Sequence, residues 1–260
     1  RAITALGPAY IKFGQILSTR PDVVGTGMAE QLRMLQDRLP PFPTAEARAL
    51  VQSELGAPVE TLFSAFSEPV AAASIAQVHE ARRADDGARV AVKVLRPGIE
   101  AAFRRDIDAF HLAAGMIERL SPGSRRLRPR DVVAHFESVV LGELDLRLEA
   151  ASASEFAENT RGDAGLSVPL PHWPLSARRV MTSDWADGIP MAEVDAIAAA
   201  GHDRHALAER LIQLFLNHAL RDGFFHADMH QGNLRVAPNG DIVAFDFGIM
   251  GEIDEYTRRV

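Results

Sequence analysis

Cysteine is absent from the 260-residue sequence, and tryptophan and tyrosine occur only twice each. Without cysteine the chain has no disulfide framework, no thiolate metal ligands and no cysteine nucleophile, which fits a reducing compartment. No uninterrupted apolar run approaches the ~20 residues of a membrane-spanning helix, and the first residues lack the basic-then-apolar pattern of a signal peptide. We therefore expect a soluble, cytoplasmic segment.

An excess of positive charge is lacking as well. The chain has 28 lysines and arginines against 35 acidic residues, which gives a net charge of -7 and a pI near 5.7. This balance argues against a general affinity for nucleic acid or anionic lipid. One local exception is the arginine run at 125–130, which we interpret as a solvated loop, with lipid or phosphate binding as the alternative.

Helical and extended patterns alternate along the chain and predict an α+β protein. Apolar residues at helical spacing predict helices over 29–39, 45–55, 99–120, 131–159 and 204–221. Branched residues predict strands over 75–81, 89–95, 178–185, 233–236 and 241–245. The first two strands flank Asp85-Asp86-Gly87 and the last two flank Pro238-Asn239-Gly240, so both pairs are predicted to form hairpins.

Two acidic loops carry the strongest chemical signal. Asp228 precedes Asn233 by five positions, and the triplet Asp246-Phe247-Gly248 follows the next predicted strand. Protein kinases place a catalytic Asp five positions before a metal-binding Asn, and a metal-binding Asp-Phe-Gly comes later. The transferring phosphoryl group spreads negative charge, which Mg²⁺ on Asn233 and Asp246 would neutralise while Asp228 orients the acceptor hydroxyl. The spacing predicts an Mg-ATP site.

Lys93 lies in the apolar strand sequence VAVKVL, which matches the strand lysine of kinases. In kinases that lysine holds its ammonium group against the α- and β-phosphates. A strand lysine alone is common, so the match gains weight from its combination with the acidic loops. We predict that Lys93 binds the phosphates of ATP or ADP.

An alanine-rich segment takes the place of the glycine-rich nucleotide loop. The kinase pattern G-x-G-x-x-G-x-V is matched in spacing by AAASIAQV, with alanine at all three glycine positions. Each added Cβ restricts the backbone, so we expect a stiffer loop that holds phosphates differently. The predicted nucleotide-binding residues of this loop are Ala71, Ala72, Ala73, Ser74, Ile75, Ala76 and Val78.

A metal-hydrolase cluster is a competing interpretation of His226-x-Asp228-x-His230. Alternating residues of an extended segment face one side and could share a metal ion. This interpretation leaves Lys93 and Asp246 without a role. On the kinase interpretation, His226 is a buried structural residue and His230 lies near the phosphates.

Four motifs together resemble the UbiB family of atypical kinases, also called the Abc1 or AarF family, which is associated with ubiquinone biosynthesis. They are YIKFGQILSTRPD, AAASIAQVH, GELDLRLEAASASEF, and HADMHQGN with the following Asp-Phe-Gly. The resemblance covers essentially the whole chain. Met229 and Gln231 depart from the family's usual HADPHPGN, and we expect them to change the stiffness of the loop more than its chemistry.

The resemblance implies an atypical protein-kinase-like, two-lobed α+β fold with an N-terminal helical extension and a truncated C-terminal lobe. The extension is expected over 1–65, the N-terminal lobe over 66–188 and the start of the C-terminal lobe over 189–260. The chain is accordingly expected to be a fragment of a longer protein.

Four residues are expected to regulate the site, on the strength of the resemblance. The Lys-x-Gly-Gln helix should fold over the cleft where a protein substrate would otherwise bind, with Lys12 and Gln15 meeting Glu143 and Asp145 of the Glu-x-Asp motif. Phosphorylation of proteins is then disfavoured.

Two further site assignments come from comparison with kinases. Glu149 lies six residues beyond Glu143 on the same predicted helix and is the expected ion-pair partner of Lys93, with Glu143 as the less favoured candidate. Segment 179–188 is expected to contact adenine through backbone groups near Asp184 and Ala186.

The resulting hypothesis is an ATPase or small-molecule kinase that uses Mg-ATP and supports ubiquinone biosynthesis. The alternative is a pseudokinase whose nucleotide state controls docking on lipid or on biosynthetic enzymes. Expected partners are nucleotide, quinone-biosynthesis enzymes and a phenolic or isoprenoid lipid, without nucleic acid. Contact with the inner membrane would rest on a C-terminal part beyond this chain.

Replacing Ala73 by glycine tests the alanine-rich loop. Ala73→Gly removes a Cβ and restores backbone freedom, so we expect the ratio of ATP affinity to ADP affinity to change. Calorimetric titration with each nucleotide measures that ratio. Unchanged affinities and turnover would count against a role for loop stiffness.

Overall fold

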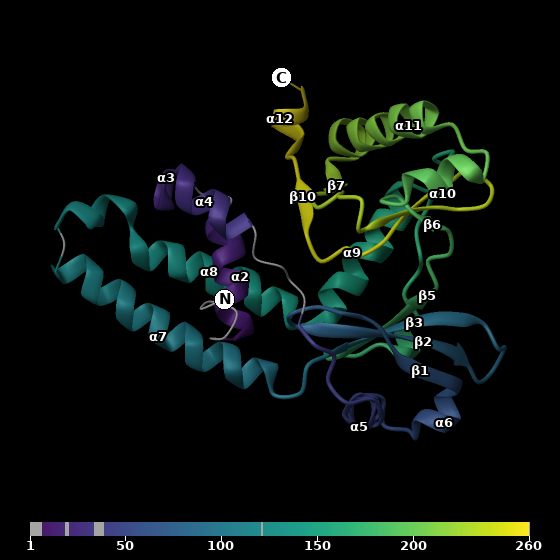
Figure 1. Ribbon diagram of the computed structural model, residues 1–260, viewed down its shortest axis with the longest axis horizontal. Coiled ribbons are helices and arrows are strands. Elements are labelled where there is room, and N and C mark those ends of the chain that lie inside the picture. Colours follow the sequence, from purple (N-terminus) through teal and green to yellow (C-terminus); the bar gives the residue numbers. More distant parts are fainter. Residues whose placement is uncertain (1–6, 19–20, 34–38, 121, 260) are drawn as a thin grey trace. The chain divides into compact units, whose positions relative to one another are not determined.

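The computed structural model describes residues 7–18, 21–33, 39–120 and 122–259, and its mixture of helices and strands confirms the α+β class (Figure 1). Contacts divide the chain into two compact units. Unit 1 comprises Arg1–Val59, Ser67–His79 and Lys93–Asp145, and unit 2 comprises Glu60–Phe66, Glu80–Val92 and Leu146–Val260. None of the helices in the described ranges is long and apolar enough to cross a bilayer.

Unit 1 is built mainly from helices. They are α2 (Pro8–Ser18), α3 (Pro21–Val24), α4 (Thr26–Arg33), α5 (Thr44–Leu55), α7 (Ile99–Leu120), the 3₁₀ turn η1 (Pro122–Leu127) and α8 (Pro129–Glu143). α7 and α8 form a long hairpin with α2 packed against it (Figure 1). Phe13 of α2, Phe110 of α7 and Phe136 of α8 pack together, with ring centroids 4.7 to 5.7 Å apart.

A four-stranded sheet has the order β1-β2-β3-β5. It consists of β1 (Phe63–Ala72), which follows α6 (Val59–Leu62), β2 (Ala76–Arg83), β3 (Arg89–Leu95) and β5 (Val180–Asp184). The division between the units passes through β1, β2 and β3. On β3, Val92 and Val94 are fully buried and Lys93 is half-buried on the opposite face, as the two-residue period of a strand requires.

Unit 2 combines helices with short strands. The helices are α9 (Leu146–Asn159), α10 (Val194–Ala199), α11 (Arg204–Asn217) and α12 (Glu255–Arg259), with a 3₁₀ turn η2 (Trp173–Leu175) and a π-helical turn η3 (His218–Asp222). One sheet has the order β4 (Leu166–Ser167), β9 (Ile242–Ala244), β8 (Leu234–Val236), β6 (Ile189–Pro190). A second pairs β7 (Phe224–His226) with β10 (Met250–Glu252) in antiparallel fashion.

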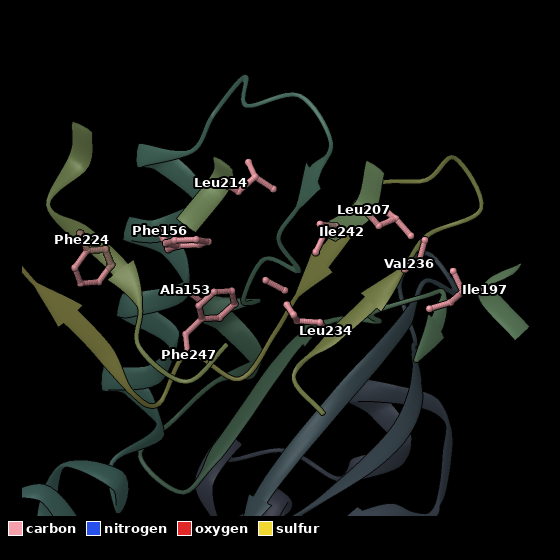
Figure 2. Packing of buried hydrophobic residues seen from close by; sticks show 11 residues of the cluster. Ala153, Phe156, Ile197, Leu207, Leu214, Phe224, Leu234, Val236, Ile242 and Phe247 are labelled. Carbon is pink, nitrogen blue, oxygen red and sulfur yellow. The ribbon is translucent and has the colours of Figure 1, made fainter. Parts of the chain in front are cut away.

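A hydrophobic cluster joins α9 to the β8–β9 hairpin (Figure 2). Ala153 and Phe156 of α9 pack with Leu234, Ile242 and Phe247, and all five are at most 3% exposed. Burial of each large apolar side chain stabilises the unit by about 1.5–3 kcal/mol. The cluster therefore fixes one face of α9 against the segment that carries the Asp-Phe-Gly triplet.

Most predicted elements are confirmed within a few residues. α5 ends at Gly56, whose φ of 70° only glycine adopts easily, and α7 has the predicted bounds. The predicted helix over 29–39 is observed as α4 over Thr26–Arg33, and positions 34–38 lie outside the described residues.

The single helix predicted over 131–159 is wrong. α8 ends at Glu143, the chain turns at Leu144 and Asp145, and α9 begins at Leu146. The amide of Leu146 donates to the carbonyl of Arg178 at 2.8 Å, a contact remote in sequence that starts the new helix. Glu143 and Glu149 consequently lie on different helices.

The helix predicted over 204–221 is also only partly correct. The α-helical part ends at Asn217, and η3 follows as far as Gly223, whose φ is 73°. An ion cluster holds this turn, because Arg221 donates to both carboxylate oxygens of Asp163 at 2.8 and 2.9 Å. His218, fully buried, lies 3.2 Å from the same carboxylate through Nε2.

The charge on Asp163 should stabilise the fold in a pH-dependent way. Hydrogen bonds from Arg221 hold the pKa of Asp163 below its usual 3.8. Asp163→Asn should therefore cost about 1–2 kcal/mol at neutral pH, with Arg221 half exposed to solvent. A carboxyl group whose pKa is lower in the folded than in the unfolded protein stabilises the fold fully only at pH values above its unfolded pKa. The difference in unfolding free energy between the parent and Asp163→Asn should therefore shrink as the pH falls through 3.8 and below.

Urea denaturation of both proteins at neutral pH and at several acidic pH values measures the difference in unfolding free energy. Asp195→Asn, at an exposed position of α10, serves as the control. A difference that stays constant into the acid range would contradict the role of the charge.

Candidate functional site

Asp228 and Asn233 lie in the short loop between β7 and β8, and hydrogen bonds fold this loop back on itself. The Nδ2 of the buried Asn233 donates to the backbone oxygen of Asp228 at 3.1 Å and to its Oδ2 at 3.3 Å. The His230 amide donates to the Asp228 carbonyl at 2.8 Å. Since the side-chain NH₂ group of Asn233 is bonded to Asp228, the side-chain oxygen Oδ1 of Asn233 is the atom suited to bind a cation.

His226 ties this loop to the strand that precedes the triplet. It is fully buried, its Nδ1 accepts from the amide of Asp228 at 3.1 Å and its Nε2 donates to the carbonyl of Phe245 at 3.2 Å. The Phe245 amide in turn donates to the Asn233 carbonyl at 3.1 Å. Both ring nitrogens are thus used in positioning, as the kinase interpretation of the sequence predicted, and this argues against His226 as a metal ligand.

The Asp-Phe-Gly triplet combines a strained backbone with a buried ring. Asp246 has φ 65°, the left-handed conformation that aspartate tolerates better than most residues but that still costs energy. Phe247 is 3% exposed and its ring lies 5.3 Å from that of Phe156 and 5.4 Å from that of His226. Anchoring of the ring holds the exposed Asp246 in its strained conformation.

Glu149 of α9 approaches the same triplet. A Cβ built on Gly248 would lie 3.5 Å from Oδ1 of Asp246 and 4.0 Å from Oε2 of Glu149, so both carboxylates flank this glycine. Glu149 is 8% exposed and follows helical spacing with Ala153 and Phe156, which places all three on the packed face of α9. The structure therefore gathers Asp228, Asn233, Asp246 and Glu149 within unit 2.

The predicted phosphate loop lies in unit 1. Ala71 and Ala72 end β1, Ala76 and Val78 belong to β2, and residues 73–75 form the turn between them. The Ala73 amide donates to the Ala76 carbonyl at 2.8 Å and closes this turn. Strand β1 was not predicted from sequence, and part of the expected loop is in fact regular strand.

Lys93 and Glu149 belong to different units, so their ion pair stays a prediction. The adenine contact near Asp184 and Ala186 also stays a prediction. Asp184 itself holds local structure, since its carboxylate lies 2.8 Å from Nε2 of His172 and accepts from the Leu170 amide at 3.1 Å.

The contact expected between the Lys-x-Gly-Gln and Glu-x-Asp motifs is present within unit 1. Nζ of Lys12 on α2 lies 2.9 Å from Oε1 of Glu143 at the end of α8, and their side chains are 15% and 10% exposed. Gln15 is half-buried on α2, and Asp145 lies in the turn that follows α8. Their regulatory role stays a prediction.

One other cluster of potential metal ligands occurs in the described part of the chain. Ligand atoms of Asp163, His218 and Asp222 lie within 4.8 Å of one another. Arg221 forms ion pairs with both carboxylates, which supplies the positive charge that a cation would bring. We interpret this group as an ion cluster that holds the π-helical turn.

The sequence patterns singled out neither Phe156, which packs against Phe247 in unit 2, nor Arg96, which contacts the alanine-rich turn in unit 1. Phe156 has an ordinary apolar position on a helix, and only the packing of its ring on Phe247 distinguishes it. Arg96 is one of many arginines, and its partners Leu39, Pro40 and Ala73 are remote in sequence. The position of Arg96 three residues after Lys93 is the one signal that could have drawn attention to it.

Residues 34–260 match the family model described as the ABC1 atypical kinase-like domain. Two curated proteins named "Probable protein kinase UbiB" are similar to this chain. The protein from Marinobacter nauticus is 44% identical over 257 residues, and that from Shewanella piezotolerans is 43% identical over 263 residues. The matches cover 97% and 99% of this chain but 47% and 48% of the relatives, so the chain spans about half their length.

A solved structure also matches. The complex of Rv3197 with erythromycin from Mycobacterium tuberculosis aligns with a TM-score of 0.68 at 33% sequence identity. The match covers 92% of this chain and 60% of that one.

Replacing His226 by phenylalanine tests the connection between the two acidic loops. His226→Phe keeps a ring beside Phe247 but leaves the Asp228 amide and the Phe245 carbonyl without their partner, which should cost about 2–4 kcal/mol. Chemical denaturation measures the loss. His205→Phe, at an exposed position of α11, is the control and should change stability little. Equal stability of the His226 variant and the parent would show that the two bonds contribute nothing.

Proposed function

Because the chain belongs to the ABC1 atypical kinase-like family, with UbiB proteins among its relatives, we propose that it binds Mg-ATP and hydrolyses it or transfers its γ-phosphoryl group to a small molecule. The observation that carries the proposal is the pair of joined acidic loops, in which Asn233 is bonded to Asp228 and His226 ties both to the strand before Asp246. Phosphoryl transfer requires acidic and amide groups held in fixed positions of this kind.

Asn233 and Asp246 have the chemistry of a magnesium site. Both offer oxygen donors, which are the ligands that Mg²⁺ prefers in proteins. Bound Mg²⁺ would neutralise charge on the β- and γ-phosphates. Asp228 would orient water or a hydroxyl group and accept its proton, and its side chain, 42% exposed, is accessible to such an acceptor.

Lys93 completes the proposed site as the group that holds the α- and β-phosphates, on the strength of its strand motif. Glu149 would align that lysine.

We propose further that the activity supports ubiquinone biosynthesis, since the two relatives carry the name UbiB. The partners would be quinone-biosynthesis enzymes and a phenolic or isoprenoid lipid at the inner membrane. Small molecules are favoured over proteins as acceptors because the Lys12–Glu143 pair anchors the Lys-x-Gly-Gln helix, which the family resemblance expects to cover the substrate cleft.

Turnover by the full-length protein tests the proposal. Asp228→Asn should bind Mg-ATP like the parent protein but lose about 100-fold or more in turnover, since it lacks the proton acceptor. Asp246→Asn should weaken Mg-ATP binding, because it removes a charged ligand. Release of phosphate is measured with and without anionic lipid and phenolic quinone precursors, and binding is measured by calorimetry.

Asp195→Asn, an exposed aspartate of the same unit, should retain full activity. Nucleotide binding without turnover in all conditions would favour the alternative of a pseudokinase that docks on lipid or enzymes. Absence of nucleotide binding in the parent protein would refute both.

A further inference from the structure

Arg96, the first residue after β3, holds two segments that are far apart in the sequence. Its Nε and Nη2 donate to the carbonyl of Ala73 at 3.1 and 2.8 Å. The same Nη2 donates to the carbonyl of Pro40 at 2.9 Å and to that of Leu39 at 3.3 Å. One guanidinium group therefore joins the alanine-rich turn to the linker 39–43 that precedes α5.

Backbone bonds fix the same turn from the other side. The Arg96 amide donates to the Ile75 carbonyl at 2.8 Å, and the Ala73 amide donates to the Ala76 carbonyl at 2.8 Å. Arg96 thus contacts the turn through both its main chain and its side chain. The turn is a closed structure with a fixed shape, whereas a glycine-rich loop would be mobile.

Gln77 of β2 makes a second connection to the linker. Its Oε1 accepts from the Phe42 amide at 2.9 Å and its Nε2 donates to the Phe42 carbonyl at 3.2 Å. The side-chain amide thus bonds both main-chain groups of Phe42, as a residue of a neighbouring strand would. Gln77 is 1% exposed, so these bonds form away from water. The Phe42 ring also lies under the guanidinium of Arg96, 5.7 Å from its centre. The linker is therefore joined to the turn through Arg96 and to β2 through Gln77.

We propose that Arg96 is a positioning residue that couples the linker 39–43 to the phosphate loop, so that movement of the N-terminal helical segment alters nucleotide binding. All of the contacts lie within unit 1. The effect on nucleotide rests on the proposed function, whereas the mechanical coupling does not. The regulation would act on how the loop holds the phosphates, and it would need no contact between the linker and the nucleotide.

Hydrogen exchange of the nucleotide-free protein tests the coupling alone. Arg96→Gln should raise exchange of the Ala73 amide and of the Phe42 amide by about tenfold or more, because bonds from a charged donor are lost. Phe42 carries the one amide hydrogen in 40–43, where the other three residues are proline, so its signal is specific. Arg104→Gln, at an exposed position of α7, is the matched control and should change neither rate.

A double-mutant cycle tests whether the two segments act together. Phe42→Ala loosens the linker without removing any hydrogen bond of the turn, yet it should raise exchange at Ala73 when Arg96 is present. In the Arg96→Gln background it should add little more. Strictly additive effects on exchange at Ala73 would overturn the coupling, as would normal exchange in Arg96→Gln.

Nucleotide affinity then tests the consequence. Arg96→Gln should change the ratio of ATP affinity to ADP affinity by about tenfold, with kcat affected less than KM. Arg96→Lys keeps the charge but lacks the fork that bonds both segments. It should resemble Arg96→Gln, and full rescue by lysine would overturn the geometric role. If the parent protein binds no nucleotide, the proposed function fails. The hydrogen-exchange rates of the Ala73 and Phe42 amides would still test whether Arg96 couples the linker to the turn.

Discussion

Two hydrogen bonds of His226 determine the separation between the acidic loops. The imidazole accepts from the Asp228 amide on one side and donates to the Phe245 carbonyl on the other, and it is fully buried. A buried ring with both nitrogens bonded cannot shift without leaving polar groups unpaired. Together with the bond from the Phe245 amide to the main-chain carbonyl of Asn233, this side chain holds Asp228 and the strand leading to Asp246 in place.

The core of unit 2 extends the same constraint to α9. Phe247 lies against both His226 and Phe156, and the ring of Phe156 also contacts the buried His218. This series of rings links the acidic loops to the ion cluster around Asp163. The apolar packing thereby places Glu149, a buried carboxylate, beside the exposed and strained Asp246.

In unit 1, side chains stiffen the backbone where kinases use glycine. Alanine in the turn and the guanidinium of Arg96 on the Ala73 carbonyl restrict the alanine-rich turn, and the Gln77 amide holds the linker at Phe42. The Lys12–Glu143 pair and the rings of Phe13, Phe110 and Phe136 anchor α2 in the same unit.

The sequence by itself determined the class of fold and the approximate bounds of α5, α7 and the β8–β9 hairpin, because helical periodicity, capping glycine and turn residues act between near neighbours. The family followed from the resemblance of four motifs. Motif spacing also predicted Asp228, Asn233 and Asp246 as site residues, and the structure brings Asp228 and Asn233 into contact. The break between α8 and α9, the strands β1, β7 and β10, the two bonding partners of His226, and the contacts of Phe156 and Arg96 were decided only by tertiary structure. Each depends on partners distant along the chain, such as the Arg178 carbonyl that starts α9, and no local pattern encodes which distant groups will meet.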